Sequence, residues 1–284
     1  MEISITDNLT KNLIDVLKPS LLRASEIRLE VAFAKYSGFF LIEDEVKKCL
    51  KNGGKAEFIL GLDFRTTEPK VLRILHTMAQ SDLDVKLYCF SDPSTNDTPV
   101  YHPKIYIIKG KDKAVISIGS SNLTYGGLKD NVEVNVIIEA AIKEEIVSDI
   151  YDVYNRLKFQ KSRFEPDLEY IEKYEEAYDI VRKKSIEALR EKRARNKVKE
   201  LRERERLLPK PKLSVTELFG WLKLVYEKLP AGQFKTRDIY LYKVEFRKIY
   251  PENRNIEAKI RQQLQFLRDM GLVKNPGRDN WEKE

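Results

Sequence analysis

The chain has 284 residues, of which 42% are hydrophobic and 34% are charged, and its formal net charge is +7. This length supports one sizeable core and a second small one, which favours two domains. No apolar run approaches the roughly 20 residues needed to cross a bilayer, and the N-terminus lacks a basic segment followed by an apolar one, so we expect a soluble, cytoplasmic protein. Cys49 and Cys89 lie far apart in apolar contexts, which predicts buried free thiols rather than a disulfide or a metal pair.

Predicted strands and helices alternate over the first 90 residues. Apolar residues at helical spacing predict a helix over residues 8–24, and strict alternation predicts a strand over residues 27–34. This alternation of strands with helices is typical of an α/β domain with a mixed sheet and helices on both faces. The remaining elements are a helix over 37–51, a strand over 56–62, a helix over 68–78 and a strand over 85–90.

Polar side chains gather around the next predicted strands, a hairpin over 101–118 and a strand over 132–139. His102 and Lys104 are two residues apart in an alternating run, so both side chains lie on one face of the strand. A Gly-Ser-Ser-Asn turn ends the hairpin, and Glu133 follows it. Because sites in open α/β sheets lie at strand ends, we expect a phosphate site where a histidine, a lysine, an amide and an acid meet.

The residues of this stretch resemble the single catalytic motif of the phospholipase D superfamily, His-x-Lys followed by Gly-Ser-x-Asn. Lys109 replaces the usual aspartate of that motif, and the hairpin over 109–113 lengthens the spacing from histidine to asparagine. This longer spacing, with a glutamate downstream, is similar to the branch that contains the metal-independent restriction endonuclease BfiI. The matching residues are His102, Lys104, Gly119, Ser120 and Asn122.

The resemblance implies phosphodiester hydrolysis through a phosphohistidine formed on His102. In it Lys104 and Asn122 hold phosphate oxygens, Ser120 supports them, and Glu133 orients the imidazole. The chain has one copy of the motif, so we infer a homodimer in which each of two subunits contributes a His102 to one active site. Paired carboxylates at nuclease spacing and His/Cys clusters are missing from the sequence, so neither a metal nor another cofactor is expected. His76, on an apolar helix, is interpreted as a packed or surface histidine.

Charge is unevenly distributed along the chain. Residues 1–181 hold 24 Lys and Arg against 30 Asp and Glu, whereas residues 182–206 hold 12 against 5 and residues 211–284 hold 15 against 10. Attraction to a polyanion therefore belongs to the later part of the chain. We expect a phospholipase D-like domain over 1–165, a charged helical linker over 166–210 and a DNA-binding domain over 211–284.

Three predicted helices, over 215–229, 235–249 and 254–270, precede a predicted β-hairpin over 271–281 with a Pro-Gly turn. Three helices and a β-wing make a winged helix, whose third helix enters the major groove. Residues 260–272 resemble the C-terminal winged helix of the methyladenine-dependent restriction enzyme DpnI. That resemblance implies recognition of N6-methyladenine in double-stranded DNA. The predicted buried stripe of the third helix is Ile256, Ile260, Leu264 and Leu267.

The opposite face of that helix and the wing carry side chains that suit DNA. Asn and Gln pair with adenine, Arg pairs with guanine, and a small Ala can contact a methyl group in the groove. Trp281 has two interpretations, as core of the small domain or as a contact to DNA or a methylated base. The other predicted DNA contacts are Asn253, Arg254, Asn255, Ala258, Arg261, Gln262, Gln265, Lys274, Asn275 and Arg278.

The functional hypothesis from the sequence is a metal-independent type IIM restriction endonuclease directed to adenine-methylated DNA. One alternative is a DNA-binding methyl reader or regulator, in which the phospholipase D-like part serves only for dimerisation. Another is a lipid or RNA phosphodiesterase, although this alternative leaves the winged helix unexplained.

Overall fold

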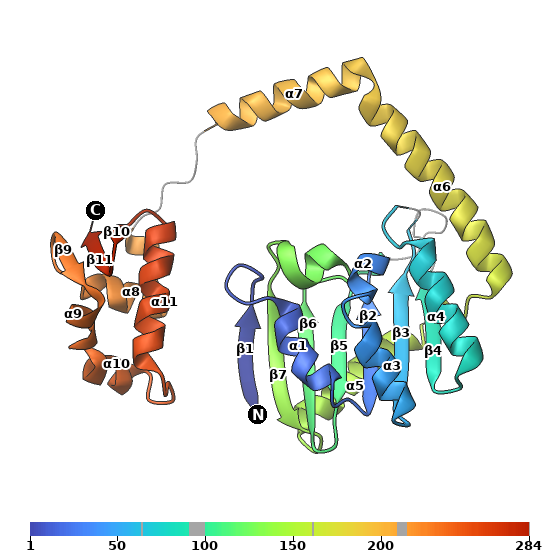
Figure 1. Ribbon diagram of the computed structural model, residues 1–284, viewed down its shortest axis with the longest axis horizontal. Helices are drawn as coiled ribbons and strands as arrows, with labels where there is room; N and C mark the ends of the chain where they lie inside the picture. Colours follow the sequence, from blue (N-terminus) through green and yellow to red (C-terminus); the bar gives the residue numbers. More distant parts are fainter. Residues whose placement is uncertain (64, 91–99, 161, 209–214, 284) are drawn as a thin grey trace. The chain divides into compact units, whose positions relative to one another are not determined.

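A computed structural model describes residues 1–63, 65–90, 100–160, 162–208 and 215–283 of the chain (Figure 1). The chain forms two compact units, Met1–Val198 and Lys199–Glu284. Within the described residues, no helix has both the length and the apolar character that a membrane span requires.

The first unit is built on a mixed eight-stranded sheet with the strand order β1-β7-β6-β5-β2-β3-β4-β8. The central strands β2, β3 and β4 run parallel to one another, and the remaining neighbours are antiparallel. The sequence prediction of a mixed sheet is therefore confirmed. The strands are β1 (Glu2–Thr6), β2 (Glu26–Val31), β3 (Lys55–Gly61), β4 (Val85–Phe90), β5 (Lys104–Lys109), β6 (Lys113–Gly119), β7 (Asn135–Ala141) and β8 (Arg163–Phe164).

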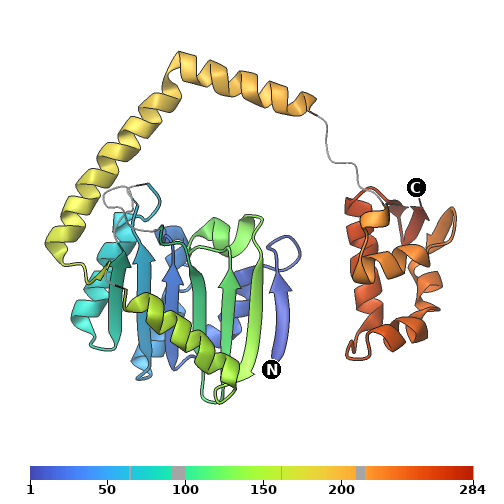
Figure 2. The ribbon, with the colours of Figure 1, turned by 180° about the vertical axis from the view of Figure 1, so that it is seen from behind.

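Helices cover both faces of this sheet, as the sequence predicted. On one face α1 (Leu13–Leu21), α2 (Tyr36–Phe39), α3 (Glu43–Lys51) and α4 (Pro69–Ser81) enclose the larger core. On the other face α5 (Glu145–Lys158) crosses the strands (Figure 2) and encloses the smaller core. Alternate residues of each strand feed the two cores, because successive side chains of a strand point to opposite faces.

The predicted linker begins as part of the first unit. Helix α6 (Leu168–Arg190) packs on α4, and its Ile171 and Tyr174 are buried in the larger core. Helix α7 (Lys192–Leu207) buries none of its described residues. The exposed, charged helix that the sequence predicts is therefore α7, whereas the first turns of α6 are a packed part of the first unit.

Three predictions for the first unit are wrong in their bounds. The helix predicted over 8–24 is α1, and the edge strand β1 that precedes it was not predicted. The helix predicted over 37–51 is two helices, α2 and α3. Strand β7 begins three residues later than the predicted strand over 132–139, because its ladder with β6 starts at the pair of Gly119 and Asn135.

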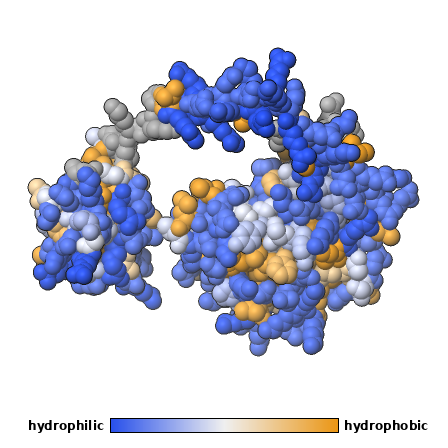
Figure 3. Space-filling view, turned by 45° about the horizontal axis from the view of Figure 1, so that its top comes forward, coloured by the Kyte–Doolittle hydropathy of each residue, from blue (hydrophilic) through white to orange (hydrophobic). Residues whose placement is uncertain are grey.

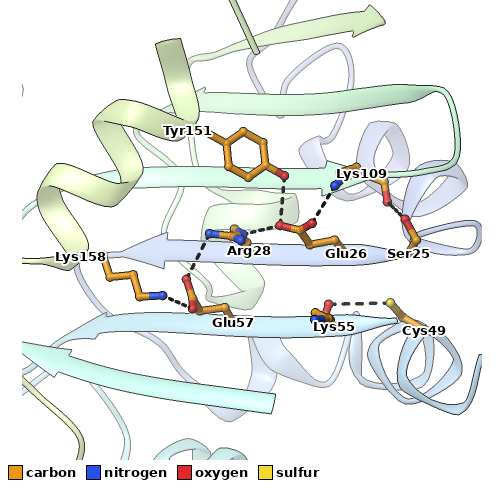
Figure 4. A network of polar contacts seen from close by, with 9 residues as sticks. All are labelled: Ser25, Glu26, Arg28, Cys49, Lys55, Glu57, Lys109, Tyr151 and Lys158. Carbon is orange, nitrogen blue, oxygen red and sulfur yellow. Dashed lines mark hydrogen bonds and ion pairs between the residues drawn. The ribbon is translucent and has the colours of Figure 1, made fainter. Parts of the chain in front are cut away.

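A network of ion pairs lies between α5 and the sheet (Figure 4). Arg28 of β2 pairs with Glu26 and Glu57, and Lys158 of α5 pairs with Glu57. Lys109, at the opposite end of β5 from Lys104, donates to Glu26 at 3.0 Å. Each member of this network has an opposite charge beside it, so the half-buried layer fastens α5 to β2 and β3.

The second unit has a small core and a three-stranded sheet with the order β10-β11-β9. The stripe predicted for its long helix α11 (Ile256–Asp269), namely Ile256, Ile260, Leu264 and Leu267, is buried. The other elements are η3 (Val215–Glu217), α8 (Gly220–Glu227), β9 (Gln233–Lys235), α9 (Thr236–Tyr240), α10 (Lys243–Ile249), β10 (Val273–Gly277) and β11 (Asn280–Lys283).

Some details of the winged-helix prediction are wrong. The helix predicted over 235–249 is divided into α9 and α10, and the helix predicted over 215–229 is reduced to η3 and α8. The hairpin turns at Arg278 and Asp279, whose φ angles are 50° and 62°, rather than at the Pro-Gly pair before them. Two consecutive residues with a left-handed backbone conformation match the twist of a two-residue hairpin turn, which accounts for the position of the turn.

Candidate active site

The predicted catalytic side chains meet at one edge of the sheet, where β2, β3, β4 and β6 end and β5 and β7 begin. His102 lies two residues before β5, whose first residue, Lys104, is opposite Val31 at the end of β2. Asn122 follows β6 after the Gly-Ser-Ser turn. Strand ends that meet at one edge thus bring together residues that are 20 positions apart in the sequence.

His102 and Lys104 are in direct contact. The Lys104 side chain is 5% exposed, and its Nζ lies 2.6 Å from His102 Nδ1 and 2.9 Å from the His102 carbonyl oxygen, to which it donates. Burial, and then the charge of Lys104, hold the pKa of His102 below its usual value. Burial also lowers the pKa of Lys104, and Glu133 opposes that shift. The imidazole is therefore neutral at neutral pH, as a nucleophile must be.

We predict that His102 titrates below pH 6.5 and that Lys104→Met raises its pKa, because the variant removes a neighbouring positive charge. The chain has only two histidines, so proton NMR of the imidazole C2 protons gives two signals that His76→Gln assigns. Unchanged titration of His102 in Lys104→Met would show that the lysine does not set the pKa of the imidazole.

The turn that carries Asn122 is rigidly held. Asn122 Oδ1 accepts the N–H of Phe33 at 3.1 Å, and no hydrogen bond from its Nδ2 is formed within the described residues. Asn135 Oδ1 accepts the N–H of Ser121 at 3.3 Å, and Tyr106 donates to the Ser121 carbonyl at 3.1 Å. A Cβ on Gly119 would lie 2.2 Å from the Val134 carbonyl oxygen, so only glycine fits there. The amide plane of Asn122 is thus fixed, with Nδ2 available to a ligand.

Ser120 and Glu133 contact each other instead of the imidazole. The Ser120 hydroxyl donates to the Glu133 carboxylate and accepts the N–H of Val134 at 3.0 Å. Glu133 also accepts a hydrogen bond of 3.4 Å from Asn131. Glu133 is not among the hydrogen-bond partners of His102 within the described chain. In a single subunit, therefore, Glu133 does not orient His102 as the sequence led us to expect.

A buried carboxyl below the site was missed in the sequence. Glu30 of β2 is 0% exposed and accepts a hydrogen bond from Tyr101, whose ring stacks on Phe90 with centroids 3.9 Å apart. Burial raises the pKa of Glu30 to about 7, and its second oxygen has no partner within the described residues. These contacts hold Tyr101, the residue directly before His102, in place. No signal in the sequence marks its burial, because Glu30 occupies a polar position of a strand that alternates cleanly.

The winged helix presents most of its predicted contacts. Arg261 and Gln265 of α11 are exposed, and Gln262 accepts a hydrogen bond of 2.8 Å from Lys259. Trp281 is only 6% exposed and donates from Nε1 to Thr236 Oγ1 at 3.0 Å, so it belongs to the core. Of the remaining predicted contacts, Arg254, Asn255, Lys274 and Arg278 are exposed, and Asn253, Ala258 and Asn275 are partly buried.

The other predicted side chains have simple surroundings. Cys49 and Cys89 are both buried and free, as predicted. His76 is partly buried on α4. In the parts of the chain that the structure describes, three or more His, Cys, Asp or Glu side chains nowhere gather in a way that could hold a metal ion.

The fold and the site define a phospholipase D-like domain. The family model described as "Cardiolipin synthase, PLD-like domain" matches residues 22–158, which include every predicted catalytic residue. A second model, described as "Dam-replacing HTH domain", matches residues 218–283. The chain therefore joins a phospholipase D-like domain to a helix-turn-helix domain of the Dam-replacing family, which contains the C-terminal domain of DpnI.

Solved structures similar to this chain include NucT from Helicobacter pylori and Nuc, a phospholipase D family member from Salmonella typhimurium. Each is 14% identical with a TM-score of 0.44, over 58% of this chain and 99% of the other. Phosphatidylserine synthase from Haemophilus influenzae is 12% identical with a TM-score of 0.47, over 66% of this chain and 46% of the other.

Proposed function

We propose that the chain is a restriction endonuclease of type IIM, which hydrolyses DNA phosphodiester bonds without a metal and is directed to N6-methyladenine by its winged helix. The observation that carries the proposal is the contact between His102 and the buried Lys104, at the strand end that also holds Asn122. A helix-turn-helix domain of the Dam-replacing family in the same chain supports DNA as the substrate.

The proposed reaction has two displacements at phosphorus. His102 Nε2 attacks the phosphorus, a P–N bond forms, and the P–O bond to the leaving oxygen breaks as that oxygen takes a proton from a second histidine. Water then attacks the phosphohistidine and gives a proton to the second histidine, and the P–N bond breaks, which restores both histidines. Lys104 and Asn122 Nδ2 are the donors that stabilise the charge on the phosphoryl oxygens.

The tautomer of the imidazole supports a second subunit. Attack by Nε2 needs the ring proton on Nδ1, but in one subunit Nδ1 faces the Nζ of Lys104. The reactive form therefore needs Lys104 to turn to a phosphoryl oxygen and a carboxylate to accept a hydrogen bond from Nδ1–H. Because Glu133 does not contact His102 of its own chain, we assign this part to Glu133 of a second copy, which also supplies the second histidine.

An uncovered apolar surface also supports a homodimer. Ile3 and Ile5 of β1, Val136 of β7 and Ile118 of β6 are exposed on one sheet face. The strand registers place all four on the side that α5 covers elsewhere, because cross-strand partners share a face. Ile118 is followed directly by the Gly-Ser-Ser-Asn turn, so the surface adjoins the site. An exposed apolar surface beside an active site that needs residues from two subunits is suited to self-association.

The test is digestion of adenine-methylated and unmethylated plasmid in excess chelator. The methylated plasmid is expected to be cut, and the unmethylated plasmid to be cut much more slowly. Absence of cutting of either plasmid, or cutting that the chelator abolishes, contradicts the proposal. Binding of methylated DNA without turnover on any substrate would favour a methyl reader instead.

The mass of the chain in solution tests the two-subunit part of the proposal separately. We expect a dimer, with Ile5→Glu and Val136→Glu shifting it toward the monomer and lowering activity together. Leu83→Glu is the control, since Leu83 is exposed on the loop before β4, away from this surface. An active monomer would contradict the two-histidine mechanism and leave the nuclease proposal standing.

A further inference from the structure

An aromatic and basic surface adjoins the turn that carries Asn122. It is formed by Tyr36 of α2, Phe40 directly after α2, and Lys70 of α4. The Tyr36 and Phe40 rings have centroids 5.9 Å apart, and the Lys70 ammonium lies 3.5 Å from the centroid of the Tyr36 ring. Phe40 is 63% exposed. Figure 3 shows that scattered apolar patches interrupt the mainly hydrophilic surface of the first unit. We call these three residues the aromatic surface.

The backbone fixes the aromatic surface next to the site. Helix α2 packs so closely on the Asn122 turn that a Cβ on Gly38 would lie 2.4 Å from the backbone of Leu123. The N–H of Lys35 donates to the Leu123 carbonyl at 2.9 Å, and the N–H of Phe33 donates to Asn122 itself. The residues on both sides of Tyr36 are therefore tied to the turn, and the aromatic surface cannot move independently of the proposed phosphate-binding amide.

The start of α4 is bound to the start of α2. Glu68, the residue before α4, accepts the N–H of Tyr36 at 2.8 Å. This bond links the helix that carries Lys70 to the start of α2. The cation and the rings thus form one preorganised unit, in which binding orders few further side chains.

Charge at this end of the unit suits a nucleic-acid strand. Within the described residues, Lys70 and Lys129 have no ion-pair partner, and Lys129 lies 5.6 Å from the centroid of the Tyr125 ring on the other side of the turn. Of the three acids that follow Phe40, Glu43 pairs with Lys47 and Glu45 with Lys18, whereas Asp44 is exposed and forms no ion pair within the described residues. Uncompensated lysines beside exposed rings bind phosphates and bases together.

We propose that the aromatic surface stacks on one or two unpaired bases next to the scissile phosphate, so that the DNA strand is locally unstacked when it enters the site. This inference rests on the proposed nuclease function and deepens it. Exposed rings stack on bases of any sequence, because every base has an aromatic face. Double-stranded recognition then belongs to the winged helix, whereas the active site prefers a strand whose bases are free.

The test uses the full chain and a single-stranded oligonucleotide that contains 2-aminopurine, whose fluorescence is quenched when it stacks. Phe40→Ala and Tyr36→Ala are expected to reduce the quenching and to lower kcat/KM on this substrate about five- to a hundredfold. Phe40→Trp keeps the ring and is expected to retain both. Phe159→Ala is the matched control, because Phe159 is 68% exposed but lies at the end of α5, on the other face of the sheet.

The two readouts separate the inference from the proposed function. A wild-type chain that cuts no DNA contradicts the nuclease, yet loss of quenching in Phe40→Ala still supports base stacking. If Phe40→Ala cleaves DNA and quenches the fluorescence as well as the control Phe159→Ala does, the inference is overturned and the nuclease proposal stands. If Phe40→Ala weakens dimerisation but not quenching, the surface is a subunit contact and the inference is overturned.

Discussion

Replacement of His102 by alanine is expected to lower the rate of DNA cleavage at least about a thousandfold, because the variant lacks the proposed nucleophile that forms the covalent intermediate. DNA affinity should be unchanged, since the basic charge lies in α7 and the second unit. The measurement is plasmid cleavage in chelator together with a binding titration of the same preparations.

The chain contains its own control for this experiment. His76, the only other histidine, lies partly buried on α4 and is no part of the site. His76→Ala should keep full activity if it folds, which its thermal unfolding checks. Equal losses in the two variants would mean that His102 acts only through stability, and full activity of His102→Ala would remove it from the mechanism.

Glu30 is expected to make the stability of the first unit depend on pH. Its pKa is about 7 in the folded chain and near 4.5 when the carboxyl is exposed, so the folded state binds the proton more tightly. Stability from this group is fully present below pH 4.5 and is lost as pH rises through 7, by up to about 3 kcal/mol. Glu30→Gln should abolish this loss and be the more stable protein at pH 8.

The measurement has to report on the first unit alone. Both tryptophans of the chain, Trp221 and Trp281, belong to the second unit, so their fluorescence is unsuitable. Pulsed hydrogen exchange of β2 and β5 peptides in urea, compared between variant and wild type at each pH, follows the right strands. Glu139→Gln, an exposed strand carboxyl on β7, is the control. An equal pH response of Glu30→Gln and wild type would contradict the assignment.

Sequence patterns predicted the parts of the site that depend on local geometry. The two-residue spacing of His102 and Lys104 placed them on one strand face, and the structure brings their side chains to 2.6 Å. The register of β6 with β7 could not be predicted, so Glu133 was placed in a strand, whereas it lies in the segment before β7 and binds Ser120. Contacts that depend on the register between strands can be predicted only when the pairing of the whole sheet is known.

Contacts made by aromatic and acidic residues within the core could not be predicted from the sequence either. Nothing near Glu30 in the sequence indicates that Tyr101 will donate to it, because 71 residues separate them. Trp281 allowed two interpretations, and only the packing of the small domain decided between them. The break between α2 and α3, which leaves Phe40 exposed, follows Gly38, and the close packing of Gly38 on the Asn122 turn has no signal in the local sequence.

Strand β1 has a consequence for how the protein is made on the ribosome. Its partner β7 follows more than 120 residues later, and between them the N–H of Glu133 contacts the Asp7 carbonyl and Asn8 donates to the Gly127 carbonyl. The residues of β1 must therefore wait until β7 has been synthesised before they can pair, at the entropic cost of a long loop. The residues proposed to be catalytic, from His102 to Glu133, are therefore all synthesised before β1 can pair, and the edge of the sheet closes only after them.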